Sequence, residues 1–91
     1  MNRTIRTTKA FEKDLKRARK RGKNLDKLKE ILDVLVTGEQ LAPRFRPHKL
    51  TGNWSGFWEC HIESDWLLIW IDEDEDTVVL SRLGSHSGLF R

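Results

Sequence analysis

The sequence contains few of the features that would assign it to a specialised class of protein. Its 91 residues include a single cysteine, Cys60, which excludes an internal disulfide and a zinc site built on cysteine pairs. No apolar run approaches the roughly 18 residues that a membrane-spanning helix needs, and the N-terminal segment lacks the apolar stretch of a secretory signal peptide. We therefore expect a protein without a membrane segment, located in the reducing cytoplasm.

The composition indicates one folded domain that spans residues 1–91. Hydrophobic residues make up 37% of the chain and there are four tryptophans, which is too apolar for a disordered chain. There is no Ser/Gly-rich linker, low-complexity tract or internal repeat that would divide the chain.

Charge is distributed unevenly between the two halves. Residues 1–50 hold 15 Lys and Arg against 6 Asp and Glu, a net charge of +9, whereas residues 51–91 hold 2 against 8, a net charge of −6. A basic half on a small domain is typical of a protein with a polyanionic partner, often nucleic acid. It is equally typical of a solvated helix face, since Lys and Arg are good helix formers.

The first half of the chain has the pattern of a strand followed by two helices. Residues 2–7 are short and partly β-branched, which predicts an edge strand. Thr8 can cap a first helix that stops at Gly22, and Asn24 can cap a second that stops at Gly38. The apolar residues of the second helix recur at helical spacing: Leu25, Leu28, Ile31, Leu32, Leu35 and Val36.

The second half has the pattern of strands. Residues 38–55 contain both prolines and predict a loop. Residues 57–63 alternate apolar and polar, residues 66–71 are apolar throughout and predict a central strand covered on both faces, and residues 77–83 form a third strand after an acidic turn. Residues 84–91 are predicted to form a C-terminal tail. The prediction is an α+β fold, β-α-α-β-β-β, with a two-helix hairpin packed on a small antiparallel sheet.

The three histidines are the clearest candidates for chemistry. They lie outside the apolar helix stripes, at His48, His61 and His86. Their spacings match no familiar metal site, and the sequence has neither a Gly-x-Ser-x-Gly nucleophile motif nor a phosphate-binding loop. Histidine titrates near neutrality, which suits general acid–base catalysis. Cys60 alternates with polar residues and is best interpreted as a small core residue.

Metal-free RNA cleavage is one reaction that such a set can perform. RNA carries its own nucleophile, the 2′-OH, so a base, an acid and a cation on the phosphate suffice. The histidines and Arg82 could supply these groups, and exposed Trp66 or Phe90 could stack on bases. Core packing is the commoner role of a strand tryptophan such as Trp66, and Arg82 could instead form a surface ion pair with the acidic turn.

Three segments together resemble the YafQ branch of the RelE/ParE toxin superfamily. They are His-Lys-Leu-Thr-Gly at 48–52, Phe-Trp-Glu-Cys-His-Ile-Glu-Ser-Asp-Trp-Leu-Leu-Ile-Trp at 57–70, and Arg-Leu-Gly-Ser-His-Ser-Gly-Leu-Phe at 82–90. The resemblance covers the whole chain. It implies a RelE-like fold and a bacterial toxin of a type II toxin–antitoxin pair. Such a toxin enters the ribosomal A site, cuts mRNA without a metal or other cofactor, and is neutralised by a cognate antitoxin.

The resemblance also implies roles for individual residues. The catalytic positions of the family fall on His48, His61, Asp65 and His86. His86 would be the general acid, and His48 and His61, supported by Asp65, would activate the 2′-OH or hold the phosphate. Arg82 would neutralise charge in the transition state. The expected substrate-binding residues are Trp66, Phe90 and Lys49. We expect the basic helix hairpin and loop, including the Lys and Arg side chains of residues 13–23, to dock an acidic antitoxin segment as well as ribosomal RNA. We expect oligomers only through the antitoxin complex.

Four positions depart from the usual family pattern. Lys49 replaces a Pro, Trp70 a Tyr and Gly88 an acidic residue, and Trp58 stands where an Arg is usual. The alternation puts Trp58 on the face of Cys60, away from His61, so we expect it to pack rather than to catalyse. One alternative is a catalytically impaired or non-enzymatic member of the superfamily that binds the ribosome, gyrase or nucleic acid without cleavage. Another is a basic scaffold that binds nucleic acid generally.

Overall fold

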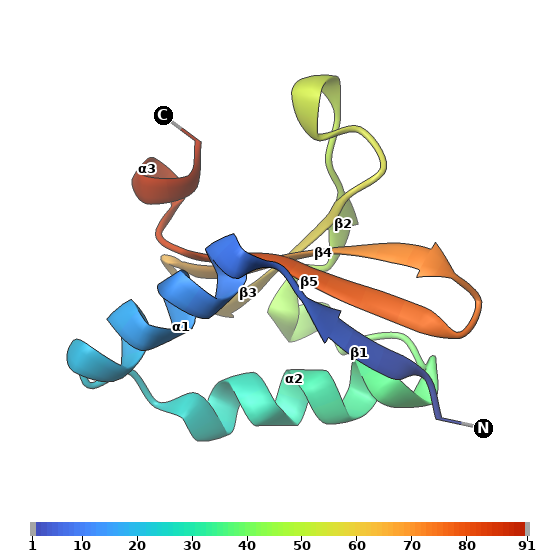
Figure 1. The fold of residues 1–91 in the computed structure, drawn as a ribbon, viewed down its shortest axis with the longest axis horizontal. Coiled ribbons are helices and arrows are strands. Elements are labelled where there is room, and N and C mark those ends of the chain that lie inside the picture. The colour runs from blue at the N-terminus through green and yellow to red at the C-terminus, as the bar shows by residue number, and fades with distance from the viewer. Residues whose placement is uncertain (1, 91) are drawn as a thin grey trace.

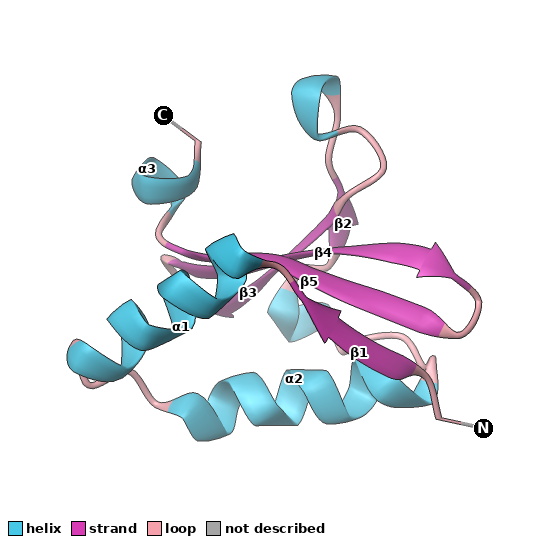
Figure 2. Ribbon diagram, viewed as in Figure 1, coloured by secondary structure: helices cyan, strands magenta, loops and turns pink. Residues whose placement is uncertain are grey.

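The protein folds as a five-stranded sheet with two helices packed on one face. The structure is a computed structural model that describes residues 2–90, and the strand order is β1-β5-β4-β3-β2 (Figure 1). The predicted α+β class and element order are confirmed (Figure 2). The elements are β1 Thr4–Thr7, α1 Lys9–Lys20, α2 Leu25–Thr37, β2 His48–Lys49, β3 Trp58–Glu63, β4 Trp66–Asp74, β5 Thr77–Gly84 and α3 His86–Leu89.

The predicted helix boundaries are confirmed by the capping contacts. The Thr8 hydroxyl accepts a hydrogen bond from the Phe11 N–H at 3.0 Å, and the Asn24 side chain accepts from the Asp26 N–H at 3.0 Å. Each bond satisfies an N–H that has no partner within the helix. Gly38 ends α2 with φ of 80°, a left-handed conformation that glycine adopts without steric cost.

The prediction of a wholly antiparallel sheet is wrong at one edge. β2, β3, β4 and β5 are antiparallel to their neighbours, but β1 pairs with β5 in parallel, from Thr4 opposite Thr77 to Thr7 opposite Leu80. A hairpin turn fixes the direction of strands that follow each other in the chain. The first and last strands share no turn, so no local sequence signal sets their relative direction.

Two segments assigned as irregular contain short regular elements. The predicted loop 38–55 includes the two-residue strand β2 and two 3-10 turns, Pro43–Phe45 and Gly52–Trp54. The C-terminal tail forms α3, one turn capped by Ser85. Elements this short carry almost no periodicity, which is why the sequence pattern does not reveal them.

The sheet separates two apolar clusters. On the face covered by α1 and α2, Trp66, Leu68 and Trp70 of β4 pack with helix residues. On the other face, Leu67 and Ile69 pack with Leu89 of α3. β4 is therefore covered on both faces, as its continuous apolar run predicts.

Trp58 and Cys60 lie on the helix-covered side of β3. The Trp58 ring stacks on Trp70, with centroids 6.1 Å apart, so its predicted packing role is confirmed. Cys60 is fully buried in the helix-side core, and burial together with the charge of Glu59 raises the pKa of its thiol to about 12. Cys60 is therefore an inert core residue, as predicted.

The register brings polar residues from separate segments into one row. His48 of β2 lies opposite Glu59 of β3, Glu59 opposite Ile69 of β4, and Ile69 opposite Arg82 of β5. This row lies on the face that carries α3 and the 50–57 loop, here called the open face, because Ile69 belongs to the cluster on that face.

Within residues 2–90, no helix has the length and apolar character needed to cross a membrane.

Candidate active site

Glu59 lies between His48 and His61 on this open face of the sheet. Its Oε1 is 3.3 Å from Nε2 of His48 and 3.7 Å from Nε2 of His61. The carboxylate side chain is only 6% exposed, whereas His48 is 49% exposed and His61 22%. A buried carboxyl group thus lies between two imidazoles that solvent, or a substrate, can reach.

Backbone carbonyls fix the orientation of both imidazole rings. Nδ1 of His48 is 2.9 Å from the Arg46 carbonyl, and Nδ1 of His61 is 3.2 Å from the Ser64 carbonyl. Because a carbonyl can only accept a hydrogen bond, Nδ1 must carry the hydrogen in each case. In a neutral ring Nε2 is then the free proton acceptor, and after it takes a proton it can donate to Glu59.

α3 carries the third histidine and is anchored by Asp65. The Asp65 carboxylate accepts a hydrogen bond from the backbone N–H of His86 at 2.9 Å. The ring of His86 lies 5.0 Å from that of Phe90, and Phe90 lies edge-on to Trp54 at 5.6 Å. The structure thus ties Asp65 to His86, while His48 and His61 form a separate pair with centroids 6.4 Å apart.

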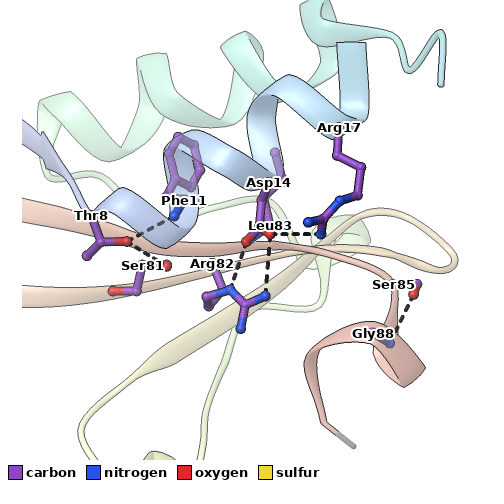
Figure 3. Close-up of polar contacts among 9 residues, drawn as sticks. All are labelled: Thr8, Phe11, Asp14, Arg17, Ser81, Arg82, Leu83, Ser85 and Gly88. Carbon is purple, nitrogen blue, oxygen red and sulfur yellow. Dashed lines mark hydrogen bonds and ion pairs between the residues drawn. The ribbon is translucent and has the colours of Figure 1, made fainter. Parts of the chain in front are cut away.

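Arg82 forms an ion pair with a buried carboxylate of α1 (Figure 3). Its Nε and Nη2 donate to the two oxygens of Asp14 at 2.8 and 3.3 Å, and the Leu83 N–H donates to the same carboxylate at 3.0 Å. These hydrogen bonds raise the pKa of Arg82 above its ordinary value. The guanidinium is therefore a permanent cation with a fixed plane.

The alternative surface pairing of Arg82 with the acidic turn is wrong. The acids at the end of β4 form ion pairs at the opposite edge of β5: Asp72 with Arg3, just before β1, at 2.6 Å, and Glu73 with Arg6 of β1 at 3.1 Å. Parallel pairing puts β1 alongside β5, next to this turn, whereas Arg82 lies near the opposite end of β5.

Two expected substrate-binding residues lie away from this face. Trp66 is 2% exposed in the helix-side core, under the ammonium of Lys23, so the expectation of an exposed stacking ring is wrong. The Lys49 ammonium lies 5.5 Å from the ring of Trp58, on the opposite face from His48. Strand alternation explains both positions, because neighbouring residues of a strand point to opposite faces. Trp66 is next to the open-face residue Leu67, and Lys49 is next to His48.

Sequence reasoning missed Glu59 and Asp14 as site residues. Glu59 has a signal, since it alternates in phase with His61 and therefore shares its face. Asp14 has a weaker signal, because it lies between Phe11 and Ala18 on the buried stripe of α1. Within residues 2–90, no group of three or more His, Cys, Asp or Glu side chains is arranged to hold a metal ion.

Comparison with known proteins identifies the family. The family described as "Bacterial toxin of type II toxin-antitoxin system, YafQ" matches residues 3–91. The chain belongs to this family. Its curated relatives include the "mRNA interferase toxin YafQ" of Escherichia coli K12, which is 34% identical over 91 residues that cover 99% of this chain and 98% of the relative. The resemblance inferred from the three sequence segments is therefore confirmed.

Solved structures of two bacterial toxins share the complete fold. The toxin in the E. coli DinJ–YafQ toxin–antitoxin complex is 33% identical and superposes with a TM-score of 0.91 over 100% of both chains. A metal-bound toxin from Helicobacter pylori is 44% identical, with a TM-score of 0.89 over 99% of this chain and 100% of that one.

Proposed function

We propose that this member of the YafQ toxin family is a ribosome-dependent mRNA endoribonuclease that uses histidine acid–base catalysis. The observation that carries the proposal is the pair of imidazoles held by Glu59 in a row that ends at Arg82, on the face where α3 presents His86. A base, an acid and a fixed cation on one face are what cleavage through the 2′-OH requires. The E. coli relative named as an mRNA interferase supports the choice of RNA.

The base in this mechanism is Nε2 of His48 or His61. It removes the proton of the 2′-OH, and the oxygen attacks the adjacent phosphorus. The imidazolium that results lies within 3.3 to 3.7 Å of Glu59, whose buried negative charge stabilises it. Glu59 takes the supporting role that the family resemblance gives to Asp65, while Asp65 positions His86 through its backbone N–H.

The acid is His86 and the phosphate cation is Arg82. As the bond from phosphorus to the 5′ oxygen breaks, the His86 imidazolium gives that oxygen its proton. The products are a 2′,3′-cyclic phosphate, or the 3′-phosphate after hydrolysis, and a free 5′-OH. Asp14 binds Nε and Nη2 of Arg82, which leaves Nη1 available for a phosphate oxygen. No metal or cofactor is required in this proposal, because RNA supplies the nucleophile.

Phe90 is the remaining candidate for substrate placement. It is half-buried and lies against both His86 and Trp54, so a base stacked on these rings would sit beside the acid. The ribosomal A site would supply and orient the mRNA. The cytoplasm is then the site of action, and the cognate antitoxin is the partner that joins the toxin in a larger complex. The solved DinJ–YafQ complex of E. coli supports such a partner.

Induced expression with primer extension on an abundant mRNA tests this proposal. Wild type should arrest growth and cut within codons, and His86→Ala should do neither. Ser87→Ala is a matched control, because Ser87 is exposed on the same turn and makes no side-chain hydrogen bond within residues 2–90. Ribosome stalling without cuts would support the non-enzymatic alternative, and undiminished cutting by His86→Ala would exclude the assigned acid.

A further inference from the structure

A cleft of about 760 Å³ opens beside α3, at the end of the sheet away from the acidic turn. Its walls are the C-terminal half of α1, the turn at 63–65, the end of β5 and α3 itself. Arg17, Arg21 and Lys23 line it from the helix side, and Ser85 and Ser87 flank it on either side of His86. The three histidines do not line it, whereas Asp65 and Arg82 do, so this cleft adjoins the histidines and shares these two residues with the candidate active site.

The acidic groups of the cleft are already bound by protein partners. The Asp14 carboxylate binds Arg82 and the Leu83 N–H, and it is 96% buried. Glu63 pairs with Lys23 and Lys27 at 3.3 and 3.0 Å. The third acid, Asp65, accepts from the backbone of His86. None of the three carboxylates is left to neutralise a further cation.

Two guanidinium groups of the cleft are left with weak or no pairing. Arg21 is exposed and forms no ion pair within residues 2–90. Arg17 reaches Asp14 only at 3.5 Å, and its side chain is 61% exposed. An exposed pair at this distance contributes little. The cleft thus holds a local excess of positive charge on side chains whose planar donors match a phosphate.

We propose that Arg17 and Arg21 bind a backbone phosphate of the mRNA next to the one that is cleaved. This inference rests on the proposed function and adds a binding subsite to it. A strand whose scissile phosphate lies between the histidine pair and His86 passes α3, and α3 is a wall of the cleft. The contact holds RNA through its backbone, so it adds affinity without a preference for base sequence.

The test compares two double variants at the C-terminal end of α1 that remove the same charge. Arg17→Ala/Arg21→Ala removes both guanidiniums from the cleft. Arg19→Ala/Lys20→Ala removes two exposed cations from the same helix end that do not line the cleft. Binding of a short, labelled 2′-O-methyl oligoribonucleotide of mixed sequence is measured by anisotropy at several salt concentrations. This probe lacks the attacking hydroxyl, so its binding is independent of cleavage.

The cleft variant should bind the oligonucleotide about tenfold or more weakly than wild type. In a plot of the logarithm of the binding constant against the logarithm of the salt concentration, the magnitude of the slope should fall by about 0.7, the value for one phosphate contact on a single strand. The control should stay within about twofold, with the wild-type slope. Equal losses in both variants, no loss in either, or no binding by wild type would overturn the subsite.

Two further measurements separate this inference from the proposed function and from another partner. If wild type cuts no mRNA but binds the oligonucleotide through Arg17 and Arg21, the nuclease proposal fails and the subsite stands. If the cleft variant keeps its RNA affinity but loses affinity for the cognate antitoxin, the cleft is an antitoxin site and the RNA subsite is wrong. Melting curves of both variants check that the fold is intact.

Discussion

Removal of the Asp14 carboxylate should destabilise the protein more than the loss of any exposed acid. Asp14 joins α1 to β5, because it accepts from the Leu83 N–H and from two nitrogens of Arg82. Asp14→Ala leaves the Leu83 N–H without its acceptor, a loss of about 1–3 kcal/mol. The unpaired Arg82 adds less than a fully buried charge would, because its side chain is 30% exposed and water screens it.

The expected loss in the free energy of unfolding is therefore about 2–3 kcal/mol for Asp14→Ala. Asp14→Asn keeps an oxygen that can accept from Leu83 and should lose about 1–2 kcal/mol. For a domain of this size each kcal/mol lowers Tm by about 4–8 °C, so Asp14→Ala should melt roughly 10–20 °C below wild type. Asp33→Asn is the control, since its exposed pair with Lys29 contributes only about 0.5 kcal/mol or less.

Urea unfolding of the three variants, followed by circular dichroism, measures these differences. The predicted order of stability is wild type, Asp33→Asn, Asp14→Asn and Asp14→Ala. If Asp14→Ala unfolds at the same urea concentration as Asp33→Asn, the carboxylate does not anchor α1, and the fixed orientation of Arg82 loses its structural basis.

Three further predictions follow from single side chains. Glu59→Gln removes the charge that stabilises an imidazolium on His48 or His61, so mRNA cleavage measured by primer extension should fall about 10- to 100-fold. The control Glu39→Gln changes an exposed residue outside the site and should cleave mRNA like wild type in the same assay. Burial raises the pKa of the Cys60 thiol from 9.0 to about 12, so the folded protein should lose stability as the pH rises from about 9 toward 12. At pH 8 the Cys60 thiol should react with a disulfide reagent only after unfolding. Rapid reaction of the thiol in the native protein would contradict its burial. Hydrogen bonds from Lys27 and Lys23 lower the pKa of Glu63 below 4.5. The ionised carboxylate therefore stabilises the fold above that pH, and this stabilisation is lost as the pH falls through the lowered pKa. The Tm of wild type should exceed that of Glu63→Gln by less on acidification, and a difference in Tm that is constant with pH would contradict this pairing.

The parts of the fold that the sequence predicts are those with strong local signals. Thr8, Asn24 and Gly38 mark the helix ends because capping is a local interaction between near neighbours. The continuous apolar run of β4 indicates a strand covered on both faces, and this is what the two clusters show. The parallel pairing of β1 with β5 joins residues more than 70 positions apart, and periodicity contains no information on it.

The candidate site was harder to predict, because its residues come together only through the pairing register of the strands. Trp66 belongs to the same strand as the open-face residue Leu67, but its phase places it in the core. No sequence signal marks the register shift between His61 and Glu63, so the contact of Asp65 with the backbone of His86 could not be predicted. The contact of Glu59 with His48 depends on the pairing of β2 with β3. Glu59 itself was visible in phase with His61, but an acid in an alternating strand is usually a solvated residue, and its burial depends on β2 beside it.

The most direct test of the account is the chemistry of the nucleophile. A ribosome-bound mRNA is prepared with one 2′-deoxynucleotide on the 5′ side of a bond that the wild-type protein cuts. This bond should resist cleavage while neighbouring sites are still cut, and the unmodified mRNA should yield a 2′,3′-cyclic phosphate or 3′-phosphate with a 5′-OH. Undiminished cleavage at the deoxy position, or a 5′-phosphate product, would contradict attack by the 2′-OH and with it the roles given to His48, His61 and His86.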